Sequence, residues 1–331
     1  MRLPLINSIL STVCKRCNGS NFQELWNMAK LSGVVPPIGT PVRGSGEVDE
    51  PALRRLTRYL LDAGVNGLLA NGTMGGFAFL TDEDQIRAVS VVVAEVDGAV
   101  PVMGCIGETS TRRAIIKAKQ IAREGVTHLT FLAPFYFFAT QENLRSYFLE
   151  VAAATDLPVF LYDNPVMTKN HIHPETVAAL RQQIPHLAGI KESKEDAVNL
   201  QKLIELNQSE SFSILTGSEF LILVALQMGC DGFVGGLHNI CPHMAVALYR
   251  AYCRGDVKGA RKLQRDLAAT WELFRYGHIW GAFDEALRYL KLAQCATGAP
   301  YVSKLTPEEV TGVHAILDRY VKPYLGKKAT R

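Results

Sequence analysis

The stretch Leu187-Ala188-Gly189-Ile190-Lys191 is a short apolar run that ends in a lysine. Its side chains are apolar at consecutive positions, which is typical of a strand that is buried on both faces in a parallel sheet covered by helices. Seven similar runs occur in the chain, and longer amphipathic stretches separate them. The eight runs are residues 34–41, 67–71, 101–107, 128–134, 158–164, 187–191, 212–217 and 232–237.

The stretches between the runs carry signals of helix starts. Asp49-Glu50-Pro51 has a proline at an early helical position, and Thr81 and Ser110 are suitable N-cap residues. Eight β-α repeats over about 220 residues predict a (β/α)8 TIM barrel, an α/β fold of about 250 residues. The main alternative is a doubly wound open sheet. That fold usually has a Gly-x-Gly-x-x-Gly turn after its first strand, and Ile38-Gly39-Thr40-Pro41 does not match it.

The strand pattern stops after residue 255. Residues 256–276, 283–296 and 307–324 predict three helices, and Thr306 followed by Pro307 is a clear helix start. We therefore expect three regions. These are an N-terminal extension of unknown role (1–32), the barrel (33–255) and a C-terminal three-helix segment (256–331).

Composition excludes several classes of protein. The chain has 331 residues, 48% of them hydrophobic, and its net charge of +3 is too small to indicate nucleic acid or a membrane surface as a partner. No apolar run reaches the roughly 18 residues of a membrane span. Seven cysteines, an odd number, favour reduced thiols and a cytoplasmic location. The pair Cys14-Lys15-Arg16-Cys17 lacks the further ligands of a tetrahedral zinc site, so we expect no bound metal.

Lys191 is the first candidate for chemistry. An ammonium at the end of a buried strand is costly unless it is paired or deprotonated, and an amine kept neutral by burial can attack a carbonyl carbon. Taken alone, Lys191 is better explained as a structural lysine whose stem lies on apolar surface while its head reaches water. The choice between the two depends on its partners.

The partners follow from the barrel, because chemistry in this fold takes place at the carboxyl ends of the strands. Tyr162 and Lys191 end neighbouring predicted strands, so their side chains can face each other. A phenol there can transfer protons, and Thr73, after the second predicted strand, can orient it by a hydrogen bond. The glycines around Thr73 allow backbone N–H groups to approach an anion. Tyr162 and Tyr136, considered singly, also fit buried aromatic residues with satisfied hydroxyls.

Four short motifs occur in order along these strand ends: Gly72-Thr73-Met74-Gly75, Pro134-Phe135-Tyr136, Tyr162-Asp163-Asn164-Pro165 and Gly189-Ile190-Lys191. With them, residues 33 to 325 resemble the dihydrodipicolinate synthase / N-acetylneuraminate lyase superfamily of class I, Schiff-base pyruvate aldolases. The resemblance implies that Lys191 forms an imine with a 2-oxo acid and that Tyr162 is the general acid and base. Thr73 would link Tyr162 to Tyr136 in a proton relay. The iminium is the electron sink, so no cofactor is implied.

The resemblance also implies an oligomer and a substrate pocket. The tyrosine at the position of Tyr136 completes the site of a neighbouring subunit in many members, which implies a homo-oligomer, commonly a dimer of dimers. The backbone amides of Thr73 and Met74 would hold the carboxylate of the 2-oxo acid. The substrate-binding residues implied are Gly72, Met74, Ser193, Gly217, Glu219, Val234 and Asn239.

Two departures from the family pattern bear on the substrate. The usual Gly-Thr-Thr-Gly-Glu is Gly72-Thr73-Met74-Gly75-Gly76 here, so one hydroxyl of the carboxylate site is missing. Met167 stands where true synthases have an arginine, and methionine cannot bind a carboxylate in bidentate fashion. We therefore predict a carbon–carbon lyase that cleaves a 4-hydroxy-2-oxo acid, such as a 2-keto-3-deoxy sugar acid, to pyruvate and an aldehyde, or condenses the two. Open alternatives are a 2-keto-3-deoxy sugar acid dehydratase, a 4-hydroxy-tetrahydrodipicolinate synthase and a non-catalytic binding barrel.

Overall fold

The computed structural model describes residues 30–207 and 209–325. The Cys14–Cys17 pair and most of the expected N-terminal extension lie outside these residues. Eight parallel strands form one sheet in the order β1-β8-β7-β6-β5-β4-β3-β2. In chain order the strands are β1 (Gly33–Val34), β2 (Leu68–Ala70), β3 (Val102–Ile106), β4 (His128–Leu132), β5 (Val159–Asp163), β6 (Leu187–Glu192), β7 (Ser213–Thr216) and β8 (Gly232–Phe233). Each lies within or beside one of the eight predicted runs.

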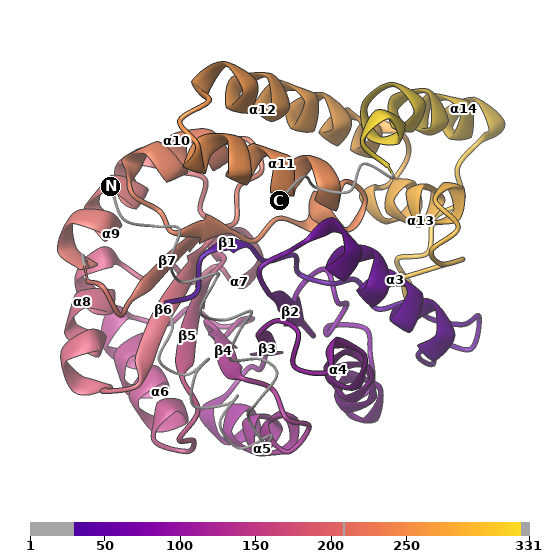
Figure 1. Ribbon diagram of the computed structural model, residues 1–331. Coiled ribbons are helices and arrows are strands. Elements are labelled where there is room, and N and C mark those ends of the chain that lie inside the picture. The colour runs from indigo at the N-terminus through magenta and orange to yellow at the C-terminus, as the bar shows by residue number, and fades with distance from the viewer. Residues whose placement is uncertain (1–29, 208, 326–331) are drawn as a thin grey trace, which may run out of the picture.

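Hydrogen bonds on both sides of the first strand close the sheet into a ring. On one side, the N–H of Val35 donates to the carbonyl of Phe233 at 3.0 Å. On the other, the chain just after β1 meets β2, where the N–H of Ile38 donates to the carbonyl of Leu69 at 3.0 Å. The predicted (β/α)8 TIM barrel is thereby confirmed (Figure 1).

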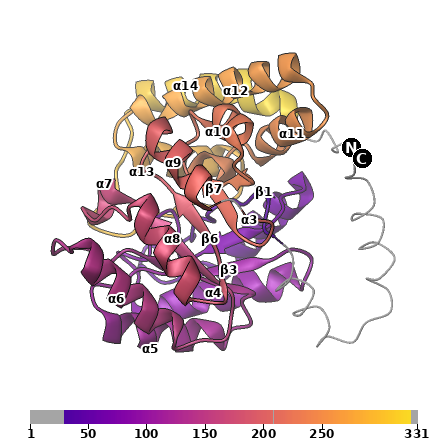
Figure 2. The same cartoon turned by 90° about the vertical axis from the view of Figure 1, so that its left-hand side faces the viewer.

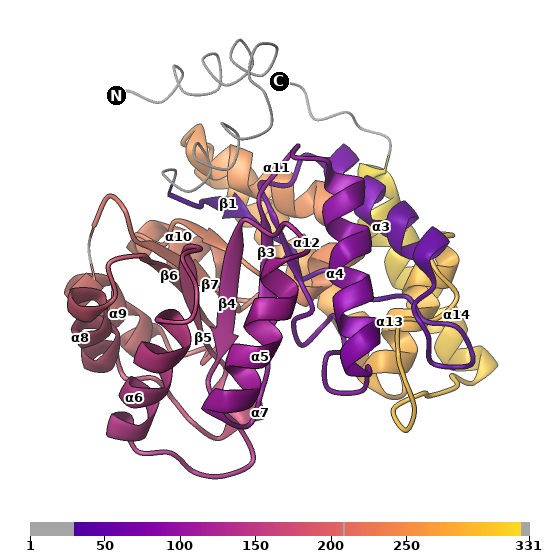
Figure 3. The ribbon, with the colours of Figure 1, turned by 90° about the horizontal axis from the view of Figure 1, so that it is seen from below.

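A helix follows every strand and covers the outside of the barrel, as Figures 1 and 3 show. Side-chain caps satisfy first-turn N–H groups in some of these helices: Asp49 accepts from Ala52 N, and Thr81 accepts from Asp84 N. Ser110 precedes α5 as expected but makes no such hydrogen bond. In chain order the helical elements up to residue 253 are α3 (Glu50–Ala63), α4 (Asp82–Val96), α5 (Thr111–Ala122), α6 (Gln141–Ala152), α7 (Pro165–Thr168), α8 (Pro174–Gln183), α9 (Ala197–Asn207), α10 (Ile222–Met228), η1 (Gly236–Asn239) and α11 (Pro242–Cys253).

The C-terminal segment is helical, as expected. It consists of α12 (Val257–Trp271), η2 (Glu272–Arg275), α13 (Ile279–Tyr289), α14 (Pro307–Ile316), η3 (Leu317–Val321) and η4 (Lys322–Tyr324). Figure 2 shows α12 and α14 together beside the barrel, where α12 packs on α11. The division of the chain at residue 255 stays a prediction, because α12 packs directly on α11, the last helix before it. No helix in the described ranges has the length and apolarity to cross a membrane.

The boundaries predicted for the middle C-terminal helix, 283–296, are wrong. The helix begins earlier, because the side chain of His278 accepts a hydrogen bond from Trp280 N at its start. It ends at Tyr289, and Lys291 has a positive φ of 60°. The apolar residues that follow form a loop, which the carboxylate of Asp284 holds by accepting from Ala296 N at 2.7 Å. The apolar pattern therefore extends past the end of the helix, which is why it predicted the C-terminal boundary wrongly.

The strands bury both faces, which explains their non-alternating sequence. Phe160 and Tyr162 of β5 lie in an inner apolar cluster inside the barrel, whereas Val159 and Leu161 lie in the outer cluster between strands and helices. Alternate residues of a strand point to opposite faces, so each strand supplies both clusters. The inner cluster consists of Leu31, Val35, Leu69, Phe77, Met103, Cys105, Leu132, Phe160, Tyr162, Leu215 and Val234.

Closure between β1 and β8 depends on a close backbone approach at Gly232. A Cβ atom at this position would lie 2.2 Å from the carbonyl oxygen and 2.5 Å from the nitrogen of Gly33. Gly232→Ala should therefore lower the free energy of unfolding by about 1–3 kcal/mol, because backbone atoms cannot move aside as a side chain can. Gly44→Ala is the matched control, since among the described residues no atom beyond its two chain neighbours lies within 4 Å of the added carbon. Equal melting temperatures of the two variants would contradict this account of closure.

Candidate active site

Lys191 and Tyr162 meet inside the mouth of the barrel. They are paired residues of the neighbouring strands β6 and β5, and only 5% and 2% of their surfaces are exposed. The Nζ atom of Lys191 lies 4.0 Å from the centre of the Tyr162 ring. In the described part of the chain, no carboxylate forms an ion pair with Lys191. The amine of Lys191 therefore rests against the face of a phenol, without a carboxylate in ion-pair contact among the described residues.

Two side chains hydrogen-bond to the phenol of Tyr162. Its hydroxyl lies 3.1 Å from Oγ1 of Thr73, and either atom can be the donor. The Nδ2 atom of Asn164 donates to the same hydroxyl at 3.1 Å. Asn164 was not among the predicted site residues. The signal that could have found it is its position two residues after Tyr162, which places both side chains on the same face of an extended chain.

A tight loop after β2 carries Thr73 and Met74. Its backbone folds back at Gly75, where a Cβ atom would lie 3.1 Å from the backbone of Asn71 and Gly72. The loop is anchored by the side chain of Asn71, which donates to the carbonyl of Cys105 at 2.9 Å. Met74 packs beside the loop after β8. Its side chain would lie 2.8 Å from a Cβ atom at Gly236, so it fills space there and offers no hydrogen bond.

Ser193, Gly217 and Val234 border the same mouth at the ends of β6, β7 and β8. The Oγ atom of Ser193 occupies the space above Gly217, where a Cβ atom would lie only 1.9 Å away. Val234 belongs to the inner cluster with Tyr162, and its N–H donates to Thr216 O at 2.8 Å. Ser193 and Gly217 therefore lie in contact at the ends of β6 and β7, and Val234 faces the inner cluster from the end of β8.

Glu219 and Asn239 differ in how far hydrogen bonds within the protein already occupy their polar atoms. The Glu219 carboxylate accepts from Leu237 N at 3.1 Å. Burial raises the pKa of Glu219, and the nearby charge of Lys191 opposes that shift. The amide of Asn239 is fully buried, accepts from Gly39 N at 3.0 Å and donates to the carbonyls of Pro37 and Gly236 at 2.9 Å. Asn239 thus joins the ends of β1 and β8, and we do not include it among the proposed substrate contacts.

Tyr136 lies apart from the other predicted residues. It is 81% exposed and has a positive φ of 80°, and Phe137 and Phe138 beside it are 75% and 87% exposed. The side chain of Asn170 anchors this loop by donating to the carbonyls of Pro134 and Phe137 (2.7 and 2.8 Å). No hydrogen bond joins Tyr136 to Thr73 among the residues that the structure describes. A single chain therefore does not assemble the expected relay from Tyr162 to Tyr136.

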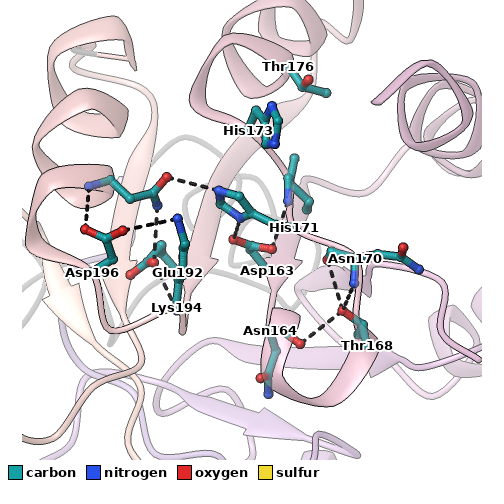
Figure 4. A network of polar contacts seen from close by, with 12 residues as sticks. Asp163, Asn164, Thr168, Asn170, His171, His173, Thr176, Glu192, Lys194 and Asp196 are labelled. Carbon is teal, nitrogen blue, oxygen red and sulfur yellow. Dashed lines mark hydrogen bonds and ion pairs between the residues drawn. The ribbon is translucent and has the colours of Figure 1, made fainter. Parts of the chain in front are cut away.

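Met167 lies in α7, directly after the strand of Tyr162. It is 61% exposed, as is Val166 beside it. The turn is held by Thr168, whose hydroxyl donates to the carbonyls of Asn164 and Asn170 at 3.0 Å (Figure 4). An exposed apolar side chain, that of Met167, therefore stands where we expected an arginine in true synthases.

The comparisons with known proteins agree with this geometry. A model of the dihydrodipicolinate synthetase family matches residues 30–320. An uncharacterized DapA-like lyase of Halobacterium salinarum is 37% identical over 71% of this chain and 76% of its own length. The probable 2-dehydro-3-deoxy-D-pentonate aldolase YjhH of Escherichia coli is 31% identical over 72% of this chain and 80% of its own. A 4-hydroxy-tetrahydrodipicolinate synthase of Nitratidesulfovibrio vulgaris is likewise 31% identical, over 72% of this chain and 82% of its own.

Solved structures give the same result. YagE of E. coli, a member of the dihydrodipicolinic acid synthase family solved in complex with pyruvate, has a TM-score of 0.84 and 26% identity over 88% of this chain and 99% of its own. The dihydrodipicolinate synthase of Thermotoga maritima has a TM-score of 0.83 and the same identity and coverage. This chain therefore belongs to the dihydrodipicolinate synthetase family, a family of carbon–carbon lyases and aldolases.

Proposed function

We propose that this protein is a class I lyase that joins Lys191 to a 2-oxo acid as a Schiff base and cleaves a 4-hydroxy-2-oxo acid to pyruvate and an aldehyde, or condenses the two. One observation carries the proposal. The Nζ atom of Lys191 is buried without an ion-pair partner in the described chain, 4.0 Å from the ring of a tyrosine that Thr73 and Asn164 orient. This is the arrangement that a nucleophilic amine and a proton-transferring phenol require.

The reaction follows from these groups. The amine of Lys191 adds to C2 of the 2-oxo acid, and loss of water leaves an iminium ion. Tyr162 takes the proton of the C4 hydroxyl, the C3–C4 bond breaks, and its electrons pass into the iminium to give an enamine. The aldehyde departs, and the enamine is protonated at C3 and hydrolysed to pyruvate and the free amine. Asn164 can only donate to the phenol oxygen, which leaves the hydroxyl proton to Thr73 or the substrate.

Backbone groups are proposed to hold the substrate. The N–H groups of Thr73 and Met74 bind the carboxylate of the 2-oxo acid, since the glycines of this loop let the backbone approach an anion closely. Ser193 and Glu219 contact hydroxyl groups of the aldehyde half, and Gly72, Gly217 and Val234 border the imine. The missing hydroxyl at Met74 removes one possible contact and leaves the backbone donors in place.

Similarity alone does not choose the second substrate, because YjhH and the N. vulgaris synthase are equally identical to this chain. Met167 favours the aldolase. Aspartate semialdehyde would bring a carboxylate in addition to that of pyruvate, and an exposed thioether cannot bind it. A dehydratase would use the same imine, and no particular contact favours it.

We also propose that the protein is a cytoplasmic homotetramer, arranged as a dimer of dimers. Tyr136, Phe137 and Phe138 form an exposed apolar loop that Asn170, two residues after α7, anchors, and Val166 and Met167 of α7 are exposed as well. Exposed apolar groups gathered in this way are typical of a protein interface. Covering them with a second copy would bring a tyrosine to the barrel mouth, where Thr73 could complete the relay. Free cysteines in the described chain support a reducing compartment.

Incubation with pyruvate and a series of aldehydes tests the proposed reaction. We expect condensation products with short hydroxyaldehydes such as glycolaldehyde, analysed by mass spectrometry, and none with aspartate semialdehyde. Condensation with aspartate semialdehyde alone would instead identify a synthase. A dehydratase would give no condensation product but would release water from a 2-keto-3-deoxy sugar acid.

Replacing Thr73 tests the orientation of the phenol. Thr73→Val keeps the shape of the side chain but removes the hydroxyl that lies 3.1 Å from that of Tyr162. We expect kcat of cleavage to fall about 100-fold or more, the usual contribution of a positioned acid–base group. Thr73→Ser, which keeps the hydroxyl, is the matched control and should retain most of the activity. Equal activity of the two variants would show that Tyr162 needs no hydroxyl partner.

A further inference from the structure

Two buried carboxylates lie directly behind the two reacting side chains. Asp163 follows Tyr162 on β5, Glu192 follows Lys191 on β6, and the two acids are paired residues of neighbouring strands. Only 1% and 2% of their surfaces are exposed. Because successive strand residues point to opposite faces, the acids point out of the barrel while Tyr162 and Lys191 point inward.

A chain of hydrogen bonds connects the two acids (Figure 4). The Nδ1 atom of His171 lies 2.7 Å from Oδ2 of Asp163, and its Nε2 atom lies 3.1 Å from Oδ1 of Asn199. The Nδ2 atom of Asn199 donates to Oε1 of Glu192 at 3.4 Å. The backbone N–H of Lys194 donates to the same oxygen at 3.0 Å. We call Asp163, His171, Asn199 and Glu192 the proton-sharing network.

The donors and acceptors of this network limit where its protons can be. With the Asn199 oxygen toward His171, Nε2 of the ring donates to it, and one proton lies between Nδ1 and Asp163, on either atom, beside an ionised Glu192. With the amide turned over, Asn199 donates to a neutral His171, and a protonated Glu192 donates to the amide oxygen. Both arrangements hold one proton beyond neutral imidazole and two carboxylates, so the network has a net charge of −1 in each.

Few other charges reach the network. The ring of His173 lies 5.1 Å from that of His171, and Lys194 pairs through its own Nζ atom with Asp196 at 3.2 Å. Cys230 lies close enough for the charge of Glu192 to raise the pKa of its thiol further, beyond the effect of burial. Burial raises the pKa of Glu192 to about 7, and the charge of Asp163 adds to that shift. Loss of the shared proton therefore leaves two unneutralised carboxylates side by side.

We propose that the proton-sharing network holds one proton at neutral pH and thereby positions the ends of β5 and β6, so that loss of this proton at alkaline pH separates Lys191 from Tyr162. The mechanical link is short, because each acid is one residue from a reacting side chain. The backbone beside the acids also ties these ends together: Ser193 N donates to Asp163 O at 2.9 Å, and Gly217 N donates to Glu192 O at 2.6 Å. The positioning role rests on the function proposed above for Lys191 and Tyr162.

Thermal melting as a function of pH tests the shared proton without any assay of activity. Glu192→Gln keeps the size of the side chain and stays uncharged at every pH. The raised pKa of Glu192 means that its stabilising contribution is present at low pH and is lost as the pH rises through about 7. The melting temperature of Glu192→Gln, relative to the parent, should therefore become more favourable from about pH 5.5 to about pH 8.5.

The exposed Glu150 of α6 supplies the matched control, since its side chain forms no hydrogen bond or ion pair within the described residues. Glu150→Gln makes the same substitution outside the network and should follow the parent at every pH. A difference between Glu192→Gln and the parent that does not change with pH would overturn the shared proton.

Trapping of the pyruvate imine by borohydride tests the positioning. In the parent the trapping rate should fall at alkaline pH, and in Glu192→Gln it should fall less. His171→Leu should trap about 10- to 100-fold more slowly at neutral pH, the usual cost of small displacements of reacting groups. Glu150→Gln should trap like the parent. Unchanged trapping in His171→Leu and Glu192→Gln would overturn the positioning role. A parent that forms no imine would instead contradict the function of Lys191, and the melting experiment would still decide the shared proton.

Discussion

The contact between the amine of Lys191 and the ring face of Tyr162 is the interaction on which the proposed chemistry depends. A second buried lysine shows what is unusual about it. Lys117 is 2% exposed, and its Nζ atom forms ion pairs with Asp82 at 2.5 Å and with Glu108 at 4.0 Å. Lys191 is equally enclosed and has no such partner within the described ranges. The same residue type thus has a structural role in one place and is suited to nucleophilic attack in the other.

The barrel creates this contact through strand register. Tyr162 and Lys191 are paired across β5 and β6, and a shift of one residue would turn one of them outward and bring a carboxylate into the mouth. The outward positions are occupied by Asp163 and Glu192, and His171 binds the first of them. The inner face therefore keeps an amine and a phenol in an apolar setting, while the charges lie on the outer face among the helices.

Much of this could be predicted from the sequence, because the strands and the motifs at their ends are local patterns. The eight runs gave the strands and their order, and the motifs brought Thr73, Tyr162 and Lys191 together. Contacts between distant segments that no motif marks could not be predicted. The link from His171 through Asn199 to Glu192 depends on how α9 packs against the sheet, and the relay that includes Tyr136 is not assembled by a single chain. The middle C-terminal helix was misplaced because apolar residues beyond Tyr289 pack as a loop.

The most direct test of the account is reduction by borohydride in the presence of pyruvate, followed by mass mapping of the peptides. The account predicts a single pyruvyl adduct on Lys191 and none on Lys117, which is equally buried but ion-paired. An adduct on any other lysine, or no adduct at all, would contradict the claim that the enclosed amine facing Tyr162 is the nucleophile.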